Sequence, residues 1–221
     1  MIPVPPYAYE PFNMAAYCLR RAAGTTPEKP ALVVMESPDT TEPAETWTFA
    51  ALEDAVLRTA AALEDRGIRK GDRLLIRLDN TSTYAILYFG AIAAGIVAVP
   101  TSSQLTPGEA QFLLEDSGAT AIALAPHLLL SDLPRGVIGL AESEAKAMQK
   151  HPRRGTYAAT IGNDPAYLLY TSGTTAHPKG VVHAHRVAIG RSPTYQSWYG
   201  IRSDDRMLHA GAFNWTYTLG T

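Results

Sequence analysis

The sequence is poor in cysteine and carries no surplus of either charge. Cys18 is the single cysteine, which excludes a disulfide within the chain and favours a reducing compartment, here expected to be the cytoplasm. Lysine and arginine total 19 against 21 acidic residues, so the formal net charge is −2. This balance offers no basic surface for nucleic acid. Cys18 lies in an apolar helical pattern, where we expect a small buried hydrophobe rather than a reactive thiol.

Targeting and membrane signals are also lacking. The first residues, "MIPVPPYAYEPFN", have no basic region of the kind that opens a signal peptide. The uncharged stretch 84–100, "YAILYFGAIAAGIVAVP", is at the short end for a membrane-spanning helix. It also breaks at Gly95, after which "IVAVP" is β-branched and strand-like. We interpret it as a buried helix followed by a buried strand, so no membrane partner is expected.

What is present is an alternation of helical and strand patterns in a chain of 221 residues, 46% of them apolar. Apolar strands without polar alternation indicate an α/β fold, with a parallel or mixed sheet covered by helices on both faces. Helices are expected from Asn13 as N-cap to Gly24, from Thr48 to Gly67, and after Thr106-Pro107. Strands are expected at 31–35, 73–78, 96–100, 119–125, 166–170 and 180–185, whereas 131–163 is harder to place and 150–154 is taken as a solvated connector.

The stretch 170–180, "YTSGTTAHPKG", places four hydroxyl groups, two glycines and a lysine between two of the expected strands. Successive backbone N–H groups, hydroxyls and a point charge suit a phosphate chain, because Gly173 has no Cβ to block its approach. The glycine spacing differs from that of the P-loop. An ordinary solvated loop has the same composition, so composition alone leaves both interpretations open.

"LLYTSGTTAHPKGVVHAH" resembles the signature of the adenylate-forming enzymes, which include acyl-CoA synthetases and peptide-synthetase adenylation domains. The stretches "TWTFAALEDAVLRTAAALEDRGIRKGDRLLI" and "LYFGAIAAGIVAVPTSSQLTPGEAQFLLEDSGA" are similar to the family's upstream segments. The resemblance implies that residues 1–221 are the N-terminal portion of the large domain of such an enzyme. The sequence departs from the family's pattern at Ala176, where a glycine is usual. This departure affects the expected phosphate affinity more than the family assignment.

The resemblance implies ATP-dependent activation of a small-molecule carboxylic acid to an acyl-adenylate, followed by thioester formation with coenzyme A. It implies Mg²⁺ on the phosphates and a catalytic role for Lys179 in neutralising the departing pyrophosphate. The phosphate-binding residues would be Thr171, Ser172, Gly173, Thr174, Thr175 and Lys179. In the segment "HAGAFNWTYTLGT", the residues Phe213, Asn214 and Trp215 would line the acyl pocket, although aromatic residues there are equally typical of core packing.

His183 and His185 are two positions apart, so they share one face of a strand. Packing or hydrogen bonding is expected for both, and no metal site is expected, because no third ligand is evident nearby.

The chain ends within the motif that contains Trp215, and the family's ribose-binding acid, adenine-binding segment and small C-terminal domain are not found in it. We therefore expect a fragment that is inactive alone and that self-associates through sheet partners left uncovered. Two alternatives stay open: a non-catalytic scaffold or weak nucleotide binder, and an adenylation domain of a peptide-synthetase-like enzyme.

Overall fold

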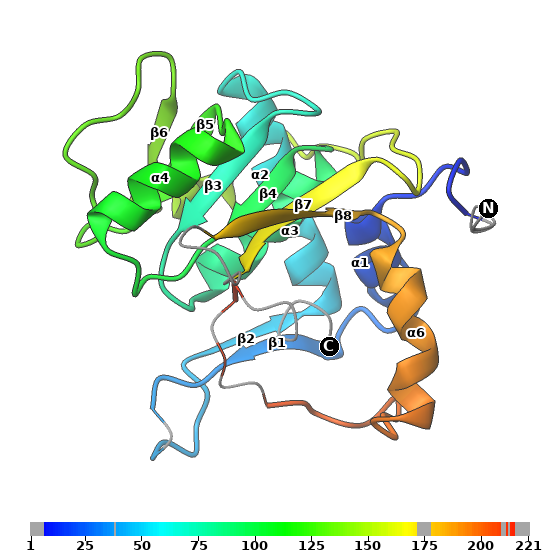
Figure 1. The fold of residues 1–221 in the computed structure, drawn as a ribbon. Helices are drawn as coiled ribbons and strands as arrows, with labels where there is room; N and C mark the ends of the chain where they lie inside the picture. The colour runs from blue at the N-terminus through cyan, green and yellow to red at the C-terminus, as the bar shows by residue number, and fades with distance from the viewer. Residues whose placement is uncertain (1–6, 38, 172–177, 209–210, 212, 215–221) are drawn as a thin grey trace.

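The computed structural model describes residues 7–37, 39–171, 178–208, 211, 213 and 214. Within these residues, the main sheet has six strands in the order β6-β5-β3-β4-β7-β8 (Figure 1). All neighbouring pairs are parallel except β7 and β8, which are antiparallel. The mixed sheet predicted from the sequence is confirmed. The strands are β3 (Arg73–Arg77), β4 (Val97–Pro100), β5 (Ala121–Leu124), β6 (Ile138–Ala141), β7 (Pro165–Thr171) and β8 (Lys179–Ala184).

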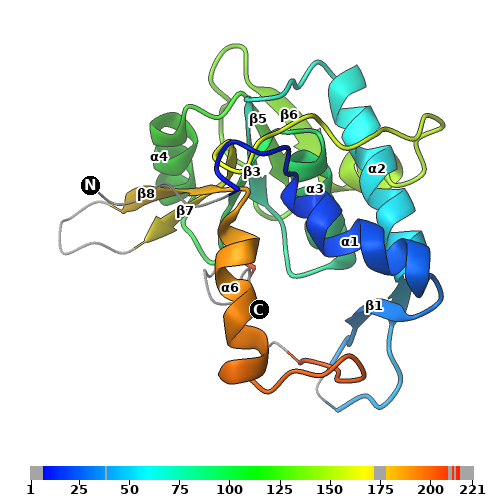
Figure 2. The ribbon, with the colours of Figure 1, turned by 90° about the vertical axis from the view of Figure 1, so that its right-hand side faces the viewer.

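Helices cover both faces of this sheet (Figure 1). One face is covered by α1 (Met14–Thr25), α2 (Phe49–Asp65), α3 (Ser82–Ala93) and α5 (Glu142–Met148). The other face packs against α4 (Pro107–Ser117). The last described helix, α6 (Val187–Ser197), follows β8 and extends from it toward the side of the molecule where β1 lies (Figure 2).

The helix starts follow from capping side chains that the sequence already shows. The Asn13 side chain accepts hydrogen bonds from the N–H groups of Ala15 and Ala16, and Thr48 caps α2 in the same way. At α4, Thr106 and Glu109 form a reciprocal capping box, and Gly118 ends the helix in a left-handed conformation. These starts agree with the prediction. Gly24 lies inside α1 rather than ending it, and Thr26 is the C-cap.

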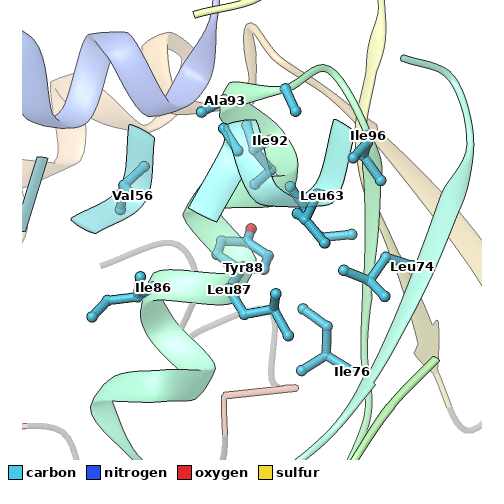
Figure 3. Close-up of a cluster of buried hydrophobic side chains, with 14 of the residues drawn as sticks. Val56, Leu63, Leu74, Ile76, Ile86, Leu87, Tyr88, Ile92, Ala93 and Ile96 are labelled. Carbon is cyan, nitrogen blue, oxygen red and sulfur yellow. The ribbon is translucent and has the colours of Figure 1, made fainter. Parts of the chain in front are cut away.

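The main core lies between the sheet and the helices α1, α2, α3 and α5 (Figure 3). Leu74 and Ile76 of β3 face this core, and Leu75 between them faces α4. Because both faces of β3 are buried, its apolar run is continuous rather than alternating. Within the described residues, none of the helices combines the length and the apolar character needed to span a bilayer.

A second, two-stranded sheet lies apart from the main one and was not predicted as a unit. β1 (Pro30–Val34) pairs antiparallel with β2 (Glu45–Thr48). The strand β1 matches the expected strand at 31–35, but β2 is only four residues long and runs directly into the cap of α2. So short a strand has too few positions to show a period of two in the sequence.

One further expectation needs correction, and another gains a detail. Cys18 is exposed, not buried, although Met14, Ala15 and Leu19 of the same helix are buried. The connector 150–154 lies on the surface, as predicted, and ion pairs also tie it to α2. Arg153 and Arg154 contact carboxylates of α2, with an N–O distance of 2.7 Å between Arg153 and Asp65.

Candidate functional site

The hairpin of β7 and β8 frames the predicted phosphate loop. The antiparallel register places Thr171 opposite Lys179 and Tyr170 opposite Gly180. The two residues of the motif that the structure describes at the mouth of the loop, Thr171 and Lys179, therefore face each other across one strand pair. Ser172, Gly173, Thr174, Thr175 and the unusual Ala176 lie outside the described residues.

The mouth of this hairpin lies at the carboxyl edge of the parallel strands. β7 runs parallel to β4, and β4 runs parallel to β3. Their last residues therefore end on one edge of the sheet, together with the segments that follow them. In open α/β sheets, ligands bind outside this edge.

Thr171 and Lys179 are both exposed. Within the described part of the chain, the Lys179 ammonium forms no ion pair with a carboxylate. An anion-binding lysine needs a charge that no neighbouring carboxylate neutralises. Among the described residues, Lys179 meets this requirement. The phosphate-binding and catalytic roles assigned from the sequence fit this arrangement and stay predictions.

Two side-chain contacts hold the strands of the hairpin in place. The Tyr170 hydroxyl donates to Asp116 Oδ2 of α4 at 2.6 Å, and burial together with this bond raises the pKa of Tyr170. On the opposite face, the rings of Tyr167 and His183 stack with centroids 4.6 Å apart. The first contact holds β7 against α4, and the second joins the two strands of the hairpin to each other.

His183 of β8 and His185, which follows the strand, have the packing and hydrogen-bonding roles that the sequence predicts. His185 is fully buried one residue beyond the strand, and its Nδ1 accepts a hydrogen bond from the Met14 N–H at 3.0 Å. Burial lowers the pKa of His183, and it lowers the pKa of His185 to about 4. No group of three potential metal ligands is found among the described residues.

The second predicted segment reaches the same edge of the sheet. The Phe213 ring lies against the buried Tyr84 of α3, with centroids 5.2 Å apart. Phe213 also lines a cleft of about 540 Å³ that β1 borders on its other side. Asn214 has a buried Oδ1 without a partner among the described residues. Trp215 lies outside them, so its predicted place in an acyl pocket stays a prediction.

Sequence reasoning missed Asn80 at this edge. Its Nδ2 donates to the Gly211 carbonyl at 3.2 Å, and its Oδ1 accepts from the Phe213 N–H at 3.3 Å. The available signal was the polar run "DNTST", which begins two residues after the buried strand β3, a position that places short polar side chains at the ligand edge.

With the geometry of the hairpin established, the family assignment follows from comparison with known proteins. The model of the AMP-binding enzyme family matches residues 19–221, nearly the whole chain. The chain belongs to the AMP-binding enzyme family. Its members with curated names include a 4-hydroxybenzoate–CoA/benzoate–CoA ligase of Rhodopseudomonas palustris, 32% identical over 193 residues. That alignment covers 81% of this chain and 36% of the relative.

A second AMP-binding relative is the long-chain-fatty-acid–CoA ligase FadD13 of Mycobacterium tuberculosis, 33% identical over 175 residues. This alignment covers 73% of the chain and 34% of the relative, so the chain spans about a third of the length of the curated relatives it matches. Among solved structures, the inhibitor-bound N-terminal domain of FACL13 from Mycobacterium tuberculosis matches with a TM-score of 0.81 and 28% identity. The match covers 95% of this chain and 53% of that one.

Proposed function

We propose that the protein containing these residues activates a carboxylic acid with ATP and passes the acyl group to the thiol of coenzyme A. The observation that carries this proposal is the pairing of Thr171 with Lys179 at the carboxyl edge of the sheet, in a chain of the AMP-binding family. Residues 1–221 are proposed to be the N-terminal portion of the large domain of this enzyme, in agreement with the share of its relatives that the chain covers.

The proposed chemistry overcomes the low reactivity of a carboxylate at neutral pH. A carboxylate oxygen bonds to the α-phosphorus of ATP while the bond from that phosphorus to the bridging oxygen breaks, releasing pyrophosphate. The thiolate sulfur then bonds to the acyl carbon, and AMP leaves with the electrons of the broken C–O bond. Catalysis of the first step consists mainly of positioning and of stabilising charge on the leaving group.

The residues of the hairpin would supply those contributions. The loop 171–175 would donate backbone and hydroxyl hydrogen bonds to the β- and γ-phosphates, as its glycine and threonine content suits. The Lys179 ammonium would neutralise the pyrophosphate as it leaves. Mg²⁺ would bind mainly through phosphate oxygens and water, the mode it prefers at nucleotide sites.

The substrate is proposed to be a small-molecule carboxylic acid with an apolar body. The ligases of Rhodopseudomonas palustris and Mycobacterium tuberculosis are named for benzoates and long-chain fatty acids, respectively. The cleft beside Phe213 is bordered by apolar side chains of β1, which supports an apolar acid here as well. A reducing compartment such as the cytoplasm remains part of this proposal, supported by the single cysteine.

Self-association of the 221-residue chain is proposed through β8, an edge strand of the main sheet on which Val181 and Val182 are 41% and 54% exposed. An apolar strand edge of this kind is a template for pairing with another chain. Sedimentation velocity at rising protein concentration tests this, and a monomer at all concentrations would contradict it.

ATP–pyrophosphate exchange tests the proposed function. The product of the complete reading frame should show exchange that depends on an added acid, assayed with acetate, benzoate and octanoate. Lys179→Ala should lower the rate on the order of 100-fold, because it removes a charge from the leaving group. Lys150→Ala, which removes another exposed lysine, is the matched control and should change the rate less than twofold. Nucleotide binding without any acid-dependent exchange would instead support a non-catalytic nucleotide binder.

A further inference from the structure

Asn80 joins two parts of the chain that are 131 positions or more apart in sequence. It follows β3 at the carboxyl edge of the sheet, just before the N-cap of α3 at Thr81. One carboxamide uses both of its polar atoms on a single backbone segment, donating to the Gly211 carbonyl and accepting from the Phe213 N–H. These two groups belong to alternate residues, so the amide binds the segment much as a neighbouring strand would.

The segment that Asn80 holds forms one wall of the cleft beside β1. Gly211 and Phe213 line this cleft together with Asn80 and Thr81. The Phe213 ring is set against Tyr84, whose hydroxyl donates to the Thr101 carbonyl at 3.3 Å. Tyr84 is buried, so its ring gives a fixed surface for Phe213 to pack on. The bonds from Asn80 then hold the backbone that carries the Phe213 ring over Tyr84.

We propose that Asn80 is a positioning residue for the acid-binding subsite: it sets the positions of Gly211 and Phe213 and thereby the width of the cleft for the acyl group. This inference rests on the proposed function, since it concerns the acid that the enzyme would activate. Asn80 contacts no part of the phosphate hairpin in any bond of the described residues. Its removal should therefore alter acid recognition and leave ATP recognition intact.

The first test reads the contact itself in the 221-residue chain and requires no activity. Amide hydrogen exchange of Phe213, followed by NMR, should become about fivefold faster in Asn80→Ala, the effect of losing one hydrogen bond of about 1 kcal/mol. Asn80→Asp keeps an acceptor for the Phe213 N–H and should restore most of the protection. Gln104→Ala removes an exposed carboxamide at the same edge and should leave the exchange rate unchanged. Equal Phe213 exchange in Asn80→Ala and the unmodified chain would overturn the proposal.

The second test uses the product of the complete reading frame. Asn80→Ala should raise KM for the preferred acid about fivefold to tenfold, with KM for ATP within twofold, and should change the ratio of kcat/KM between benzoate and octanoate. Gln104→Ala should change none of these values. Equal changes in both KM values, or an unchanged acid ratio, would show that Asn80 acts only on stability. If the unmodified protein shows no acid-dependent exchange, the proposed function fails, and the Phe213 exchange rates alone decide whether Asn80 positions the segment.

Discussion

The imidazole of His185 connects the end of β8 to the start of α1. Its Nδ1 accepts from the Met14 N–H, so the ring proton is on Nε2, and the His185 N–H donates to the Asp164 carbonyl at 3.0 Å. Burial lowers the pKa of His185 to about 4, an effect that Asp164 opposes and Lys70 adds to. Protonation of Nδ1 would remove the acceptor from the first turn of α1.

We therefore expect folding stability to depend on pH through His185. The unfolded imidazole, with its ordinary pKa of 6.5, binds a proton at a higher pH than the folded one does. The stabilisation is complete above pH 6.5 and is lost as the pH falls toward 4, with a limit of about 3 kcal/mol. Urea unfolding at pH 7, 6, 5 and 4.5 measures this. His185→Gln should flatten the profile, whereas His127→Gln, which alters an exposed histidine, should not. Parallel profiles for all three proteins would contradict the assignment.

At the scale of elements, the contact between α2 and α3 depends on one glycine. A Cβ built on Gly90 of α3 would lie 2.7 Å from Thr59 Cγ2 and 2.9 Å from Thr59 Cβ. Thr59 is fully buried on α2, so the two backbones approach closely only because position 90 has no side chain. The main core shown in Figure 3 lies between these helices and β3. The close packing of the core side chains therefore depends on the distance between α2 and α3.

Gly90→Ala should destabilise the protein by about 1–3 kcal/mol, because the added methyl overpacks the helix contact. Gly108→Ala is the matched control: it adds the same methyl to α4, with no heavy atom within 4 Å, and should be neutral or stabilise by up to about 1 kcal/mol. Thermal unfolding measures both. Combining Gly90→Ala with Thr59→Ser should recover part of the loss, since Cγ2 is removed. A neutral Gly90→Ala would show that the helices separate freely.

At the scale of the whole molecule, the described residues present a sheet covered on both faces, with a hairpin whose mouth opens at the carboxyl edge. The hairpin and the residues that Asn80 binds both lie at this edge. The helix α6 extends from the sheet toward the side of the molecule where β1 lies (Figure 2). The cleft beside Phe213 and the lysine of the hairpin therefore lie at the same edge of the sheet.

The 221-residue chain alone is expected to give no acid-dependent ATP–pyrophosphate exchange. It spans only about a third of its curated ligase relatives, and a nucleotide held only through its phosphates would not be oriented for in-line attack. Exchange measured with the chain and with the product of the complete reading frame, at equal concentration, tests this. Activity of the chain within tenfold of the longer product would contradict it.

Much of this molecule could be predicted from local signals. Three kinds of signal depend only on neighbours in sequence: the helix caps at Asn13, Thr48 and Thr106, the continuous apolar strands, and the polar stretch 170–180. These signals predict the helices, the mixed sheet and the hairpin. The same stretch determined the family, because its residue types and spacing are specific to it.

Only the tertiary structure decided the contacts between distant segments. No periodic pattern in the sequence indicates the pairing of β1 with β2, the bond from Met14 to His185, or the bonds from Asn80 to Gly211 and Phe213. The exposure of Cys18 was likewise decided by tertiary packing, since Met14, Ala15 and Leu19 of the same helix are buried and Cys18 is not. Burial and hydrogen bonding across long sequence separations depend on how elements pack, whereas capping and periodicity depend on adjacent residues.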